Sequence, residues 1–111
     1  MATAIKQLVT VQEYVIASGA TQTVDVFPHS GWQGSAEYTL VFTTLSGGTR
    51  MKLLKLIANK VGAGVRDQVS HRAGDVISLD VIAQIAGSDF ELEITNNDSV
   101  SVNLNIIKIK S

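Results

Sequence analysis

The sequence predicts an all-β domain: an antiparallel β-sandwich of jelly-roll or immunoglobulin-like type, with about 7–8 strands. First, apolar and polar residues alternate with a period of two in most segments. Second, glycine-containing turns separate these segments at intervals of roughly 8 to 15 residues. Third, no helical segment provides the crossover that a parallel sheet requires. At 111 residues the chain can bury one two-layer core, so we expect a single domain over residues 1–111.

The first two strands are expected over Ile5 to Ile16 and over Thr21 to Phe27. The apolar residues of Ile5 to Ile16 change parity along the segment, which indicates a bulge or a strand that contributes to both sheets. In the second strand Val24 and Val26 alternate with polar residues. The loop at residues 28–34 then contains two glycines and the only proline.

The middle of the chain is expected to form a hairpin and an edge segment. Ala36 to Thr44 alternates cleanly and precedes a Gly-Gly turn. Residues 50–60 could form a helix or a strand, and the turn before them favours the strand. Val65 to Arg72 is polar and fits either an edge strand or an ordered loop. Val76 to Ile85 has apolar residues on both faces, which indicates a strand covered on both sides.

The clearest alternation lies in the last third of the chain. Its apolar members are Phe90, Leu92, Ile94, Val100, Val102, Leu104 and Ile106. The polar turn at residues 96–98 divides them, which predicts a β-hairpin with one buried face. Beyond it the apolar parity changes to Ile107 and Ile109, which indicates a bulge or a two-sided strand.

Composition and motifs argue against most chemistries. A net charge of -1 offers no attraction for nucleic acid or an anionic membrane. The N-terminus lacks the basic start and apolar run of a signal peptide, and no apolar segment is long enough to span a membrane. Without cysteine there are no disulfides, thiol catalysis or Cys-based metal sites. His29 and His71 are too far apart for a local metal motif, and no Gly-x-Ser-x-Gly elbow occurs. We therefore expect no enzyme activity, no cofactor and no metal site.

Two features favour protein contacts instead. The charged fraction of 17% is below the usual value of roughly 25%, and interface cores are depleted in charge. Trp32 lies in the loop at residues 28–34, where it could cap one end of the sandwich or project into a partner. Capping is favoured because a large aromatic side chain is usually buried.

Four segments together resemble a small β-sandwich module of structural proteins of tailed bacteriophages. They are Glu37 to Phe42, Met51 to Asn59, Asp75 to Val81 and Phe90 to Ile109. The resemblance implies that Met51 to Asn59 is a strand and that the protein belongs to a virion. Such modules occur inside tail fibres and as free-standing shell proteins. The chain begins with methionine and contains little beyond the sandwich, which favours the second type.

The function that this resemblance implies first is that of a capsid decoration or cement protein. As a symmetric homo-oligomer it would bind the major capsid protein or other virion proteins through multivalent contacts. Met1 to Val11 and Ile107 to Ser111 are the expected contact segments, because ordered chain ends need partners. The candidate partner-binding residues are Ile5, Leu8, Trp32, Ile107 and Ile109.

Two alternatives remain open. One is a tail or receptor-binding module whose end loops, including Trp32, touch a glycan or protein on the host surface. The other is a carbohydrate-binding module, which is disfavoured because aromatic residues make up 5% of the chain and leave few surfaces for stacking on sugars.

Overall fold

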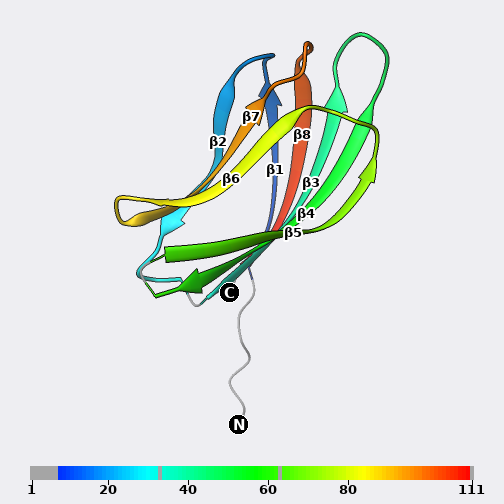
Figure 1. Cartoon of the computed structure of the whole chain (residues 1–111). Coiled ribbons are helices and arrows are strands. Elements are labelled where there is room, and N and C mark those ends of the chain that lie inside the picture. Colours follow the sequence, from blue (N-terminus) through cyan, green and yellow to red (C-terminus); the bar gives the residue numbers. More distant parts are fainter. Residues whose placement is uncertain (1–7, 33, 63, 111) are drawn as a thin grey trace.

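The computed structural model describes residues 8–32, 34–62 and 64–110, and the side chains of all of these except residues 8–10 and 69–72. Within these residues every regular element is a β-strand, and all pairings are antiparallel. The strands are β1 (Leu8–Ile16), β2 (Thr21–Pro28), β3 (Ser35–Thr44), β4 (Met51–Val61), β5 (Gly64–Gly74), β6 (Leu79–Ala86), β7 (Asp89–Asn96) and β8 (Val102–Lys110). They form a five-stranded sheet, β1-β8-β3-β4-β5, and a three-stranded sheet, β2-β7-β6 (Figure 1). The predicted antiparallel β-sandwich is confirmed.

The predicted C-terminal hairpin is wrong, although both of its strands exist. Strand β7 pairs with β2 and β6 in the smaller sheet, whereas β8 pairs with β1 and β3 in the larger sheet. The alternating pattern shows which side of each strand is buried, but two strands that face one core from opposite sheets have the same pattern as a hairpin. The turn after β7 is therefore a connection between sheets.

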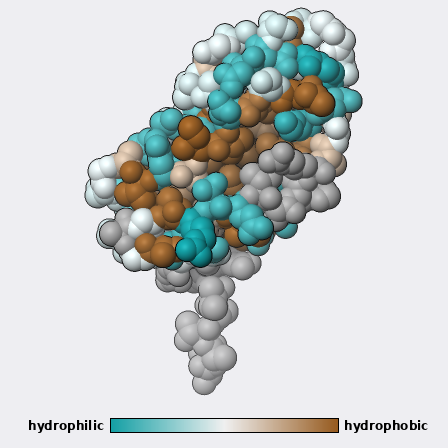
Figure 2. All heavy atoms as spheres, in the orientation of Figure 1, coloured by the Kyte–Doolittle hydropathy of each residue, from teal (hydrophilic) through white to brown (hydrophobic). Residues whose placement is uncertain are grey.

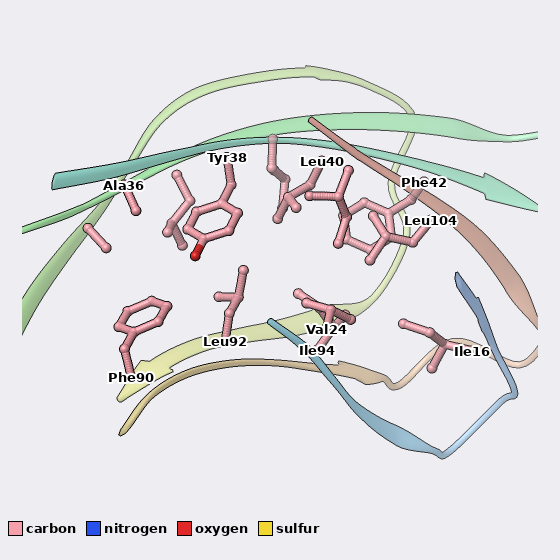
Figure 3. Packing of buried hydrophobic residues seen from close by; sticks show 14 of the residues in the cluster. Ile16, Val24, Ala36, Tyr38, Leu40, Phe42, Phe90, Leu92, Ile94 and Leu104 are labelled. Atoms are coloured by element: carbon pink, nitrogen blue, oxygen red, sulfur yellow. The ribbon is translucent and has the colours of Figure 1, made fainter. Parts of the chain in front are cut away.

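The core lies between the two sheets and contains alternate residues of the central strands. In β3 every second side chain is buried, and β7 has the same pattern. Figure 3 shows Tyr38 and Leu40 of β3 facing Phe90 and Leu92 of β7 across the core. Each of these four side chains is fully buried, and burying one contributes about 1.5–3 kcal/mol.

Asn96 holds the connection from β7 to β8 in place. Its side chain is fully buried, and its amide nitrogen donates hydrogen bonds to the carbonyl oxygens of Ile16 at 3.0 Å and Val100 at 2.9 Å. Its side-chain oxygen accepts a hydrogen bond of 2.9 Å from the backbone N–H of Asp98. One asparagine thus satisfies three backbone groups where the chain leaves one sheet for the other.

Two uncertain segments of the sequence are strands. Residues 51–61 form β4, which pairs with β3 through the predicted turn, and Gly47 and Gly48 in that turn have φ of 71° and 88°. The segment Val65 to Arg72 lies within β5, the edge strand next to β4. Both the preference for a strand at residues 50–60 and the edge-strand alternative for Val65 to Arg72 are confirmed.

The two parity changes in the sequence correspond to strands with apolar residues on both faces and not to bulges. Strand β1 pairs with β8 in an unbroken register, and β8 pairs with β3 in the same way. Both strands have apolar side chains on both faces; in β1, Ile16 points into the core and Val11 points away from it. The two-sided alternative is therefore confirmed for β8. For β1 the expected bulge, or contribution to both sheets, is not found within residues 8–16.

A bulge occurs instead in β2, where the sequence showed regular alternation. The register with β7 shifts between Thr23 and Asp25. As a result Val24 is buried, Asp25 turns toward the core, and Val26 is 50% exposed.

Strand β6 begins later than predicted. The residues before it form a loop, in which Val76 is 83% exposed and Ile77 is buried. Ile82, which was expected to be covered, is 46% exposed on the outer side of β6. Within the described ranges no helix is present that could cross a membrane.

Candidate functional site

The outer face of the larger sheet is rich in apolar side chains. The register places Val11, Ile107, Thr39 and Lys55 side by side across four strands, on the side opposite to the core. We call this surface the apolar face; its apolar members are Val11, Val15, Val41, Met51, Leu53, Ile57, Ile107 and Ile109. Four of them are at least 44% exposed, namely Val11, Val15, Met51 and Ile107.

Charged groups are few on the apolar face within β1, β3, β4 and β8. Lys55 and Glu37 lie on neighbouring strands, with 3.9 Å between Nζ and Oε2, and their side chains are 43% and 41% exposed. Glu13 on β1 adds one further carboxylate. Positive and negative charges therefore nearly cancel on this surface.

The outer face of the smaller sheet has the opposite character. Its three strands contain no lysine and no arginine. We call it the acidic face; its carboxylates are Asp80, Asp89, Glu91 and Glu93. Threonines border them, and the hydroxyl groups of Thr21 and Thr95 lie 2.8 Å apart. The sandwich thus has one acidic outer face, which also exposes Val26 and Ile82, and one nearly neutral outer face with more apolar residues.

The space-filling view shows how unevenly hydrophobic residues reach the surface. Figure 2 shows them in the middle and at the lower left of the visible face, with hydrophilic residues between and around them. Single exposed apolar residues are common on soluble proteins, whereas contiguous groups mark contact sites.

An ion pair connects the two sheets at the interior. Lys108 Nζ lies 2.9 Å and 3.0 Å from the two carboxylate oxygens of Asp25, and these side chains are 15% and 8% exposed. Tyr38 donates its phenolic hydrogen to the same carboxylate. Burial raises the pKa of Tyr38, and the hydrogen bond and charge of Asp25 raise it further, so the phenol stays a donor. The Nζ atoms of Lys108 and Lys110 also lie 5.1 Å and 4.9 Å from the ring centre of Phe27.

A second ion pair ties the loops at the end of the sandwich away from residues 29–34. Arg50 donates two hydrogen bonds to Asp98, at 2.8 Å and 3.2 Å, and a third to the carbonyl oxygen of Val76. The hydrogen bond from Arg50 lowers the pKa of Asp98 to about 2, helped by the backbone N–H of Ser78. Three loops distant in sequence are thereby fastened together.

The described residues do not form a catalytic, metal-binding or ligand-binding site. They contain no cluster of three or more histidine, cysteine, aspartate or glutamate residues able to hold a metal ion. A shallow hollow of about 230 Å³ is lined by Lys52, Ala73, Gly74, Asp75 and Val76. Its charged groups already have partners, because Lys52 donates to the carbonyl of Ile77 and Asp75 accepts from the backbone N–H of Met51.

The candidate partner-binding residues fall into three groups. Ile107 is 44% exposed and Ile109 is partly buried, and both lie on the apolar face. Leu8 is the first residue of β1 and pairs with Lys110, but its side chain is not among those that the structure describes. Ile5 lies outside the described residues. The expected contact segments 1–11 and 107–111 are thus described only in part.

Trp32 lies in the core, which matches the first of its two alternatives. Its side chain is 3% exposed and packs against Phe27 and Phe90 at ring distances of 5.2 Å and 5.3 Å. Its indole N–H donates to the carbonyl oxygen of Ser35 at 3.0 Å. This burial leaves the indole almost no surface for a partner.

The apolar face was not predicted as a unit from the sequence. Its signal was the change of parity in residues 5–16 and after Ile106. The first predicted a bulge or a strand that contributes to both sheets, and the second predicted a bulge or a two-sided strand. Apolar residues on both faces of adjacent strands are typical of a sheet with two apolar sides.

No protein-family model matches this chain, and no curated protein sequence does. Solved structures do. The tailspike protein of Acinetobacter phage vB_ApiP_P1 matches 98% of this chain with a TM-score of 0.61 at 13% identity. The fold therefore also occurs within a phage tailspike. This chain corresponds to 24% of that protein's length.

A second tailspike has a similar segment. It is gp49 of Acinetobacter baumannii bacteriophage Fri1, which is described as a capsular polysaccharide depolymerase; 94% of this chain matches 18% of it with a TM-score of 0.50 at 7% identity. This match corrects the prediction that the chain has no enzymatic role. A similar fold occurs within a protein described as a depolymerase, so the lack of a catalytic motif in the sequence was not a sufficient reason for that prediction.

Proposed function

We propose that this chain is a virion module of the phage tail, of the kind present in tailspikes, and that it acts where the particle contacts its host. The observation that carries the proposal is the match of 98% of the chain to part of a tailspike. The comparisons offer no support for capsid decoration, the function that the sequence put first. Both neighbours are tail proteins.

The surface chemistry supports a role in protein packing. The apolar face offers Val11 and Ile107 for contacts with neighbouring protein, while the acidic face has four carboxylates that favour water. Burial of the apolar face against other tail protein would hold the module in place. The ion pair between Asp25 and Lys108 keeps the two sheets together while this happens.

The host surface that we propose is a capsular polysaccharide, since one neighbour is described as a capsular polysaccharide depolymerase. Direct stacking on sugars by this module is not favoured. Of its six aromatic residues, Phe27, Trp32, Tyr38, Phe42 and Phe90 are buried, and Tyr14 is partly buried with its hydroxyl bonded to the carbonyl of Val24. A stacking platform needs an exposed aromatic face.

The location and the number of copies in the particle test the proposal. Gold-labelled antibodies against this chain should mark the tail in electron micrographs of virions, and mass spectrometry should find far fewer copies than of the major capsid protein. An antibody against the major capsid protein serves as the control. Label over the whole shell, with copy numbers near those of the capsid protein, would overturn the tail assignment in favour of capsid decoration.

A further inference from the structure

We propose that the apolar face binds a second copy of this chain, so that two sandwiches pack with their larger sheets face to face. This inference goes beyond the tail assignment and does not depend on it. It rests on the exposure, size and charge of the face.

The exposed apolar side chains are spread over this face, and two of them, Val11 and Ile107, are direct neighbours. Val11 and Val15 on β1 are 71% and 62% exposed, Ile107 on the adjacent β8 is 44% exposed, and Met51 on β4 is 50% exposed. The register places Ile107 directly opposite Val11 and next to Thr39 on the central strand. Sheets of this kind stack with their side chains interdigitated, roughly 10 Å apart.

The area is at the lower end of what a stable pair needs. The four strands of the apolar face, about 4.8 Å apart, give a width of roughly 19 Å, and nine residues at about 3.3 Å each give a length of roughly 30 Å. The flat projection is about 570 Å² on each copy, or about 1,100 Å² for the pair. A biological interface buries at least about 1,000 Å² in total.

The distribution of charge favours contact between two copies through the apolar face and disfavours contact through the acidic face. On the apolar face within β1, β3, β4 and β8, Lys55 is paired with Glu37 and Glu13 is the one further charged residue, so two copies meet with little repulsion. On the acidic face, Glu91 and Glu93 of one copy would meet the same residues of another, and no lysine or arginine in β2, β6 or β7 could compensate them. Like charges brought together at an interface cost several kcal/mol. A second copy, which presents the same near-neutral surface, therefore fits the apolar face.

Sedimentation velocity of the purified full chain between about 1 and 100 μM tests the pairing, because interfaces of this size have dissociation constants in the micromolar range or below. Wild-type protein should sediment as a dimer at the upper end of this range. Ile107→Lys should weaken the dimer by about 100-fold or more, since it places a charge from each copy in the interface. The matched control is Ile82→Lys, because Ile82 is 46% exposed on the outer side of the other sheet. Circular dichroism verifies that both variants fold.

A cross-linking experiment locates the contact independently. The chain has no cysteine, so a single introduced thiol reports on one position. Thr39→Cys lies in the middle of the apolar face, and Thr95→Cys lies on the central strand of the acidic face. A short bis-maleimide should join two copies of the Thr39→Cys variant and leave the Thr95→Cys variant monomeric.

Three results would overturn the proposal. The first is a wild-type protein that stays monomeric at every concentration. The second is a dimer that Ile82→Lys weakens as much as Ile107→Lys does. The third is efficient cross-linking at Thr95→Cys with none at Thr39→Cys.

Discussion

Replacing Lys108 by methionine should reduce the stability of the fold far more than the same change at a surface ion pair. Lys108 neutralises Asp25 between the two sheets, where the two side chains are 15% and 8% exposed. Methionine keeps most of the apolar length of lysine and removes the charge. The Asp25 carboxylate would then keep the hydrogen bond from Tyr38 but would lose its ionic partner.

The expected magnitude follows from the burial. Removing one partner of a buried ion pair costs about 3–5 kcal/mol, because the remaining charge is left uncompensated. The exposed 15% of Lys108 admits some water, so we expect the lower end, about 3 kcal/mol. With a urea slope of about 1.5 kcal/mol/M, the midpoint of unfolding would fall by about 2 M.

The chain contains a natural control for this experiment. Lys55 and Glu37 form an ion pair of 3.9 Å with side chains 43% and 41% exposed. Lys55→Met should cost less than about 1 kcal/mol, because water already screens that pair. Urea unfolding can be followed by the fluorescence of Trp32, the single tryptophan, which is buried and becomes exposed on unfolding.

A second substitution separates charge from packing. Asp25→Asn in the Lys108→Met background removes the unpaired charge and keeps an oxygen that can accept the hydrogen bond from Tyr38, so it should restore about 1–2 kcal/mol. Equal losses for Lys108→Met and Lys55→Met, or further destabilisation by Asp25→Asn, would refute the reasoning that Asp25 is a buried charge.

Three further predictions concern the loops. The pKa of Asp98 is about 2 in the folded protein and about 3.9 in the unfolded chain, so its stabilisation is present above pH 4 and is lost as the pH falls toward 2. Asp98→Asn should remove this part of the pH dependence in acid titrations of unfolding. Gly74→Ala should cost more than about 2 kcal/mol, because φ is 99° and the new Cβ would overlap the carbonyl of Met51; Gly48→Ala, with φ of 88° and open space, should cost about 1–2 kcal/mol in urea unfolding, and equal costs would contradict this. Asn96→Ala should lower the free energy of unfolding by at least about 2 kcal/mol, since it leaves two backbone carbonyl groups unpaired, and a loss below about 0.5 kcal/mol would argue against that role.

Strand positions and buried faces could largely be predicted from the sequence. Residues 36–44 and 90–94 alternate without interruption, and their inward side chains are buried as predicted. Gly47 and Gly48 indicated the turn that makes residues 51–61 a strand. These features depend on neighbours in the sequence, so a period of two and a turn are sufficient to predict them.

The apolar face could be predicted from the sequence only in part. Met1 to Val11 and Ile107 to Ser111 were expected as two contact segments, but the sequence did not indicate that Val11 and Ile107 are neighbours. In the structure Val11 lies directly opposite Ile107, although 96 positions separate them in the numbering. A surface formed by strands from both ends of the chain has no local sequence signal.

The amino-acid sequence was sufficient to predict an all-β sandwich and, for most strands, which side is buried. The reason is that the hydrophobic effect acts on each side chain separately. The tertiary structure decided which strands pair, that β7 and β8 lie in different sheets, and that Asp25 meets Lys108. Backbone hydrogen bonds are the same for every residue type except proline, so strands with equal patterns are interchangeable as partners until the whole core packs. The apolar face exists for the same reason, since it appears only when β1, β8, β3 and β4 align in one sheet.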